Sequence, residues 1–455
     1  MIGIFNILML LRLSSGNERS IKVKKNIYAS FVIKGLNMGI GFILVPLTIK
    51  YLNPTKYGIW ITLSSLITWI SFFDVGLGNG LRNRFTEAIA KGEHELARVY
   101  ISTTYAILSI IISGFLIIFY TINPFLNWGV ILNAGDDLLL QAELSVLALI
   151  VFTFFCIGFV LQLITTILTA DQQPAKASFF DFLSKVIALA FIFVLTKTTS
   201  GSLLHLGVVL SGSPIVVLLL SSVWFYNKRY KSYKPSLKHI DFSKSKDLLN
   251  LGVKFFFIRI AAILLYSTNN IIISHLFGPA EVTPYSIAVT YFNILMLGFT
   301  IVVSPFWSAF TEAWVKNEIE WIKKAMQKLI GFWGLLVFTG MIMLLGSKWI
   351  FSIWIGDKVI VAYSISILVV VWILITAWNG TFSQLLYAVG AIKIQSSLTL
   401  FVAIMNIPIA IYLGFKVGIE GVLITNVALA AIQMWIYPVQ YKKIINKTAT
   451  GIWAK

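Results

Sequence analysis

The sequence predicts an all-α protein that crosses a membrane twelve times, in two six-helix bundles. Composition is the first observation: 58% of the 455 residues are hydrophobic, 12% are charged, and the mean hydropathy is +0.87. A soluble domain carries about 25% charged residues. The second observation is a series of long apolar stretches. The third is an internal repeat, which divides the chain into two similar halves.

Twelve apolar stretches are long enough to span a bilayer. About 20 residues suffice, because a helix rises 1.5 Å per residue and the hydrocarbon core is roughly 30 Å thick. The stretches are continuously apolar and lack the alternation of a membrane-spanning strand, which favours helices over a barrel. They fall near residues 27–51, 57–78, 99–122, 144–168, 178–198, 203–226, 249–276, 285–307, 325–346, 359–386, 394–415 and 419–440.

The repeat has an offset of 225 residues. Residues 85–88, Phe-Thr-Glu-Ala, recur as residues 310–313, and seven of the eleven positions in 85–95 are identical to their counterparts. Six crossings per half return the chain to the side from which it started. We therefore expect two bundles related by a pseudo-twofold axis along the membrane normal, with a cavity where they face each other. Lys91 and Lys316 are one of these identical pairs, and further pairs at this offset are Lys34 and Arg259, Pro54 and Pro279, and Arg98 and Lys323.

The repeat and the apolar stretches together predict the division of the chain. The expected parts are a cytoplasmic N-terminal segment (1–23), a first bundle (24–227), a basic cytoplasmic linker (228–246), a second bundle (247–445) and a cytoplasmic tail (446–455).

The 36 Lys and Arg residues predict the orientation. With the N-terminus inside, 25 of them lie in or beside inward-facing segments, and six lie on the outward side. The positive-inside rule then places both termini and the linker in the cytoplasm. The net charge of +18 is accordingly interpreted as orientation and contact with anionic headgroups, and no nucleic-acid partner is expected.

The sequence lacks the residue patterns typical of disulfide frameworks, metal sites and nucleotide-binding loops. Cys156 is the single cysteine, and the four histidines are scattered without metal-ligand spacing. No phosphate loop of the GxxxxGK[ST] type is present, and Gly76–Gly80 follows an apolar helix, where a bend is the better interpretation. We therefore expect no enzyme activity, no metal and no cofactor.

A short elbow is predicted after the second span of each half. Residues 82–91 form an amphipathic helix, and Gly92 suits the left-handed conformation that ends a helix. Asn317, at the equivalent position, is the next most tolerant residue. A capped turn and a paired inner gate are both compatible with this pattern.

Charges inside the predicted spans point to a binding site, because each costs at least about 2.5 kcal/mol at the bilayer centre. Lys34 lies roughly 10 Å beyond the inner boundary and Arg259 roughly 14 Å. Lys185 is at a similar depth to Lys34 and can pair with Asp181 one turn away. The alternative to a binding site is that these side chains snorkel to the interface, and this explanation is weaker for Arg259 than for Lys34.

The neighbours of these cations favour a water-filled cavity over lipid. Lys34 shares a helical stripe with Asn37 and Gly41, while Arg259 shares one with Tyr266 and Asn269–Asn270. No acidic residue at comparable depth in the first or seventh span neutralises the two cations. A cationic cavity open to the cytoplasm, and hence an anionic ligand, is the simplest interpretation.

The chain also resembles a known family. Residues 51–60 (YLNPTKYGIW) and 73–83 (FDVGLGNGLRN) resemble the Wzx-type polysaccharide and O-antigen flippases of the multidrug/oligosaccharidyl-lipid/polysaccharide flippase superfamily. The resemblance implies a multi-pass protein of the bacterial cytoplasmic membrane that flips an undecaprenyl-diphosphate-linked oligosaccharide from the inner to the outer leaflet by alternating access. Membrane lipids, the polysaccharide polymerase and the chain-length machinery are the partners that it implies.

The resemblance and the charges both favour one mechanism, in which Lys34 and Arg259 bind the diphosphate of the substrate. Asn37, Tyr266, Asn270 and Lys185 are further candidate binding residues. Asp74 and Asp181 are candidates for proton or sodium coupling, with helix-end solvation or pairing as the alternative.

Two other functions are alternatives to this one. A multidrug exporter would favour an acidic cavity. A membrane-embedded polymerase or acyltransferase would need a larger outward loop than 123–141, whose Asp136 and Asp137 lack a basic partner.

Overall fold

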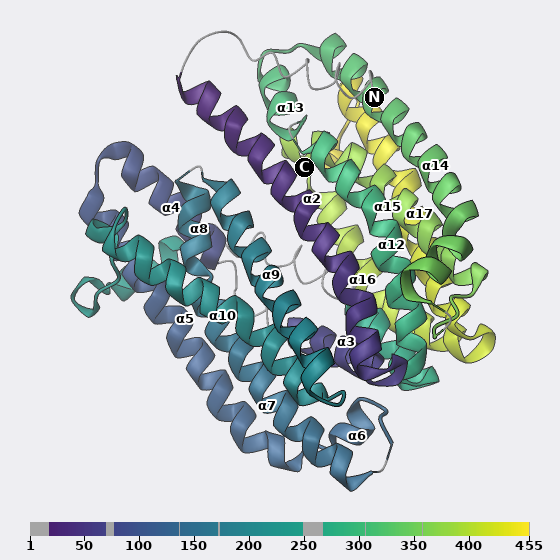
Figure 1. Ribbon diagram of the computed structural model, residues 1–455. Helices are drawn as coiled ribbons and strands as arrows, with labels where there is room; N and C mark the ends of the chain where they lie inside the picture. The colour runs from purple at the N-terminus through teal and green to yellow at the C-terminus, as the bar shows by residue number, and fades with distance from the viewer. Residues whose placement is uncertain are drawn as a thin grey trace.

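The computed structural model describes residues 18–69, 77–135, 137–171, 173–248, 267–304, 306–356 and 358–454 (Figure 1). Within these ranges the chain is almost entirely helical and contains no β-strand. The expected all-α membrane fold is confirmed. The helices are α2 (Glu18–Leu52), α3 (Pro54–Thr68), α4 (Leu77–Lys91), α5 (His94–Ile122), α6 (Trp128–Ile131), α7 (Leu138–Leu161), α8 (Leu163–Ala170), α9 (Pro174–Thr198), α10 (Leu203–Asn227), α12 (Pro279–Val303), α13 (Phe306–Val315), α14 (Ile319–Ile355), α15 (Tyr363–Ala388), α16 (Lys393–Val417) and α17 (Ile419–Ile445).

Ten candidate membrane spans occur among the described residues, and they coincide with ten of the twelve predicted stretches. The other two stretches, near 57–78 and 249–276, lie partly outside the described residues. The count of twelve spans, and with it the two six-helix bundles, therefore stays a prediction.

Local sequence explains where these helices begin. Asn53 caps α3: its side-chain oxygen accepts from the backbone N–H of Lys56, and Pro54 occupies the first helical position. Ser202 caps α10 in the same way, accepting from the N–H of His205. Each cap satisfies a backbone donor of the first turn that has no partner within its own helix.

The two elbows have the same backbone geometry. Gly92 follows α4 with φ of 76°, and Asn317 follows α13 with φ of 58°, so both adopt the predicted left-handed conformation. The next residue of each elbow donates its N–H to an alanine carbonyl, Glu93 to Ala88 at 2.8 Å and Glu318 to Ala313 at 2.8 Å. These pairs are again 225 residues apart. The repeat in the sequence is therefore a repeat in structure at this point.

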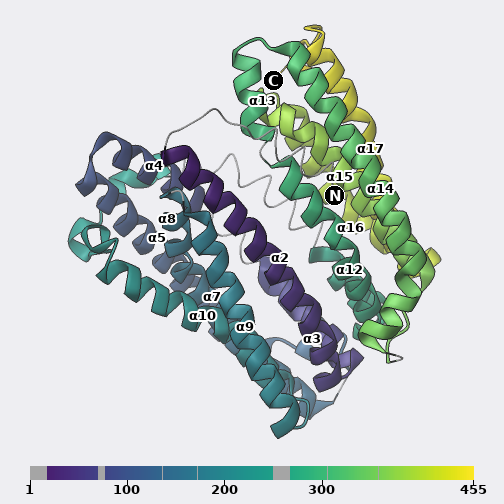
Figure 2. The same ribbon diagram turned by 45° about the horizontal axis from the view of Figure 1, so that its top comes forward.

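The helices form two groups on either side of α2. One group contains α4, α5 and α7 to α10, and the other contains α12 to α17 (Figures 1 and 2). In both views α3 lies at the end where the groups meet, and α4 and α13 lie at the opposite end. The second group has one buried apolar core, into which Val45 and Ile49 of α2 and Tyr57 of α3 pack, and the first group has two.

The segment after α10 is bound to the first group. His94 Nδ1 and the Tyr233 hydroxyl form a hydrogen bond of 2.6 Å, and Arg98 Nε donates to the Lys234 carbonyl at 3.1 Å. Residues 228–246, predicted only as a basic linker, are thus attached along the start of α5.

Candidate functional site

The helix α2 carries two different exposed stripes. Val32, Leu36 and Ile43 are 41%, 52% and 54% exposed and lie on one side. Lys34, which is exposed, and Asn37, which is half-buried, lie on the other side of the helix. Lys34 is two positions after Val32, and side chains two positions apart in a helix point in directions that differ by roughly 200°. An apolar stripe suits contact with lipid, whereas a polar stripe suits contact with water.

The polar stripe borders open space. A Cβ atom added to Gly41, one turn beyond Asn37, would meet no atom within 4 Å. Among the described residues, no carboxylate lies within ion-pair distance of Lys34. The Lys34 ammonium therefore makes no direct ion pair with a described carboxylate, and such a group can attract an anion.

Asp181 joins α2 to α9 beside this stripe. Its Oδ2 accepts a hydrogen bond from Asn37 Nδ2 and lies 3.4 Å from Lys185 Nζ. The ion pair expected between Lys185 and Asp181 is therefore present. The carboxylate is 58% exposed and the lysine 42%, so the pair is solvated and adds little to stability. The structure brings together Asn37, Asp181 and Lys185, all of which the sequence singles out.

The remaining candidates are distributed differently. Arg259, Tyr266 and Asp74 lie outside the described residues. Asn270 donates through Nδ2 to the hydroxyl of Ser65 in α3 at 2.9 Å. Ser65 lies well inside α3, about 16 Å along the helix from its first residue, Pro54. Asn270 therefore takes part in a contact between the first and second halves of the chain.

The two halves meet by backbone contact where α3 and α12 begin. A Cβ atom on Gly58 would lie 1.6 Å from the carbonyl oxygen of Pro279, so only glycine fits there. Thr283 donates its hydroxyl to the carbonyl of Pro54 at 2.7 Å. Pro54 and Pro279 are 225 residues apart, as are Gly58 and Thr283. Each half thus presents the same position to the same carbonyl of the other half, as in a twofold contact.

Further hydrogen bonds between the halves gather at the same end. Trp354 Nε1 donates to the Phe42 carbonyl at 2.7 Å, and the Ser274 hydroxyl donates to the Leu132 carbonyl at 3.1 Å. By the predicted topology this is the outward end. These hydrogen bonds join the two halves toward that end.

A cluster of buried amides lies in the second group of helices. Asn406 Nδ2 donates to Asn426 Oδ1 at 2.7 Å, and Asn379 Nδ2 donates to the Ala430 carbonyl at 3.0 Å. They border a cavity of about 70 Å³, and the Oδ1 atoms of Asn379 and Asn406 have no partner among the described residues. Buried polar groups of this kind bind water. Sequence reasoning missed this cluster, although asparagines inside apolar stretches were a signal for it.

Metal chemistry receives no support from the part of the chain that the structure describes. No group of three or more His, Cys, Asp or Glu side chains occurs there in a position to hold a metal ion.

Fold and site together define a multi-pass helical membrane protein whose two helix groups meet at one end. A solved structure described as the inward-facing conformation of a multidrug resistance MATE family transporter of the MOP superfamily has the same fold. Its TM-score is 0.74 at 15% identity, and the alignment covers 92% of this chain and 96% of that one.

The chain belongs to the polysaccharide biosynthesis protein family, whose sequence profile matches residues 23–310. It is similar to the "Putative O-antigen transporter" of Salmonella typhimurium strain LT2, with 25% identity over 435 residues, 92% of this chain and 96% of the relative. It is also similar to the "Putative O-antigen export protein" of Yersinia pseudotuberculosis, with 21% identity over 416 residues, 90% of this chain and 93% of the relative. The family that residues 51–60 and 73–83 suggest is confirmed.

Proposed function

We propose that this protein flips a polyprenyl-diphosphate-linked oligosaccharide from the inner to the outer leaflet of the bacterial cytoplasmic membrane. The names of its relatives support export of a surface polysaccharide precursor. The observation that carries the proposal is the polar stripe of α2, where Lys34 is exposed and has no described carboxylate within ion-pair distance. A lipid diphosphate has the charge that such a site would bind.

The proposed binding site uses charge for the diphosphate and amides for the sugars. Lys34 supplies a point charge, and Arg259 supplies a planar guanidinium suited to two phosphate oxygens. Asn37 and Lys185, tied to each other through Asp181, would border the sugars. Water in the cavity reduces the cost of dehydrating the hydroxyl groups, and the polyprenyl tail remains in the lipid.

The proposed transport cycle is alternating access, and the α3–α12 contact supports one of its two states. In the proposed cycle the α3–α12 contact closes the outward side while substrate binds from the cytoplasm, and it separates when the inward side closes. Such a change requires two arrangements of the helix groups that bind substrate with different affinities. The fit of Gly58 against Pro279 supports one of these arrangements.

Gene deletion tests the proposal. Cells lacking the protein should accumulate the lipid-linked oligosaccharide in the inner leaflet and lose the surface glycan, and the wild-type gene should restore both. Loss of surface glycan without accumulation of the lipid-linked precursor would instead indicate an enzyme of precursor synthesis, and would contradict the proposal.

A further inference from the structure

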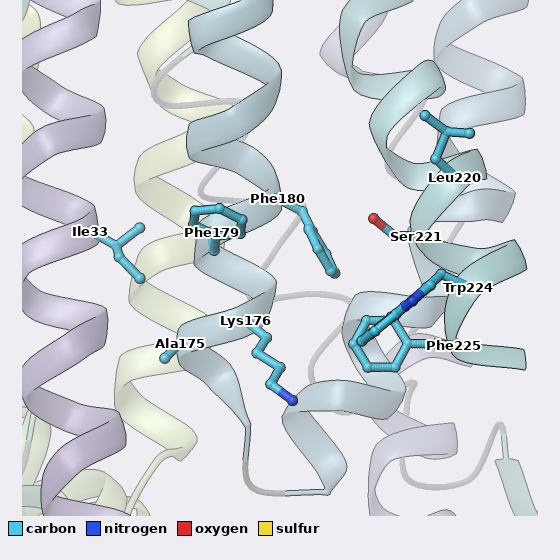
Figure 3. A pocket seen from close by; sticks show the side chains of 9 residues that line it. All are labelled: Ile33, Ala175, Lys176, Phe179, Phe180, Leu220, Ser221, Trp224 and Phe225. Carbon is cyan, nitrogen blue, oxygen red and sulfur yellow. The ribbon is translucent and has the colours of Figure 1, made fainter. Parts of the chain in front are cut away.

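A second feature of the molecule is an apolar groove on α9 and α10, at the end of these helices that carries the linker. The groove has a volume of about 770 Å³ and is lined mainly by aromatic rings, with Ile33 as its wall on α2 (Figure 3). Phe179, Phe180 and Trp224 line it, and Phe179 and Trp224 are 45% and 55% exposed. The groove is therefore open along the flank of the first helix group.

One cation lies at the end of this groove nearest the linker. The ammonium of Lys176 stands 5.6 Å from the centre of the Phe225 ring, within the range of a cation–π contact. No described carboxylate pairs with Lys176. Asp171 is occupied elsewhere, because it accepts from Arg229 Nε at 2.9 Å and from the Tyr230 hydroxyl at 2.8 Å.

The order of these groups along the helices matches the order of groups in a membrane lipid. Lys176 lies in the first turn of α9, and Phe179 and Phe180 lie about one turn deeper. By the predicted topology this turn is at the cytoplasmic interface, where exposed tryptophans such as Trp224 are common. A charged phosphate at Lys176 would thus be followed by an apolar chain among the rings.

We propose that this groove binds one anionic phospholipid of the inner leaflet, with its phosphate at Lys176 and one acyl chain along Phe179, Phe180 and Trp224. Charge selects the headgroup, since one lysine near a membrane surface contributes about 1 kcal/mol toward an anionic lipid. The aromatic walls bind the chain without selectivity for charge. A membrane phospholipid is favoured over the carrier lipid because Ile33, and not the polar stripe of Lys34 and Asn37, forms the wall on α2.

Quenching of Trp224 by brominated lipids tests this site. The probes are phosphatidylglycerol and phosphatidylcholine with the same dibrominated acyl chain, added to the purified protein in neutral detergent. The chain has 14 tryptophans, so the Trp224 signal is taken as the difference between the wild type and Trp224→Phe. Phosphatidylglycerol should quench this signal at about a fivefold lower mole fraction than phosphatidylcholine.

Substitutions at Lys176 distinguish a specific site from general attraction to a basic protein. Lys176→Gln should abolish the preference for phosphatidylglycerol, and Lys176→Arg should retain it. Lys197→Gln, in the last turn of the same helix, is the matched control and should also retain it. Equal quenching by both lipids in the wild type, or an unchanged preference in Lys176→Gln, would overturn the proposal. So would displacement of the brominated phosphatidylglycerol by equimolar polyprenyl phosphate, which would identify the carrier lipid as the occupant.

Discussion

Lys34 is the residue at which the hypothesis of a cationic binding cavity can be tested most directly. It lies on the polar stripe of α2, and its ammonium lacks a described carboxylate within ion-pair distance. If Lys34 only snorkels to the interface, its side chain anchors the helix and its charge is not needed to bind substrate. If it holds a diphosphate, its charge is needed for transport.

Substitution of the two cavity cations should separate these interpretations. Lys34→Arg should be tolerated, while Lys34→Ala and Arg259→Ala should each cripple export with normal amounts of protein in the membrane. Loss of one charge-assisted contact costs about 1.5–3 kcal/mol, roughly 10- to 150-fold in substrate affinity. The measurement is surface glycan in a deletion strain, with each variant expressed at matched, limiting levels. Wild-type glycan in both alanine variants would discard the cationic cavity and leave the fold unaffected.

At the residue scale, sequence reasoning predicted pairs within one helix better than pairs between helices. The Lys185–Asp181 pair follows from a spacing of four residues and is present at 3.4 Å. The hydrogen bond between Asn37 and Asp181 links residues 144 positions apart. Spacing cannot predict such a contact, because it depends on how α2 packs against α9.

At the element scale, the elbows were predictable from the sequence and the α3–α12 contact was not. Gly92 and Asn317 adopt the expected left-handed conformation because local backbone sterics demand it. The fit of Gly58 against Pro279 depends on two helices whose first residues are 225 positions apart. The sequence indicates that Pro54 and Pro279 are equivalent positions. It does not indicate that the segments around them are in contact.

The α3–α12 contact should tolerate only glycine at position 58. In Gly58→Ala the added methyl group would overlap the Pro279 carbonyl, so the closed arrangement should lose about 1–3 kcal/mol, a 5- to 150-fold loss of population. Spin labels at Leu139 and Ile360, which are 82% and 86% exposed near the outward ends of the two halves, report the separation.

The label distance should increase in Gly58→Ala, and export should fall with it. Gly114→Ala is the matched control, because a Cβ atom there meets nothing within 4 Å, and its distance distribution should equal that of the wild type. A distribution in Gly58→Ala that is identical to the wild type would show that the contact does not hold the outward end closed.

At the scale of the whole molecule, the orientation in the membrane is open to direct measurement. Single cysteines at Ser232, in the linker, and at Leu139, in the first turn of α7, can be introduced after removal of the buried Cys156. A membrane-impermeant thiol reagent on intact cells should label Leu139→Cys and not Ser232→Cys. The opposite pattern would reverse the predicted topology.

Translocation by the purified protein tests the central claim most directly. Liposomes containing the lipid-diphosphate-linked oligosaccharide in both leaflets are prepared with and without the protein, and an impermeant glycosidase measures the accessible fraction over time. Without protein, about half of the glycan should remain protected, because the diphosphate and sugars cannot cross hydrocarbon unaided. With the wild-type protein the protected half should become accessible, and with Lys34→Ala or Arg259→Ala the rate should fall at least about tenfold. A protected fraction that stays the same with and without the wild-type protein, in sealed vesicles and under an imposed proton or sodium gradient, would contradict the account.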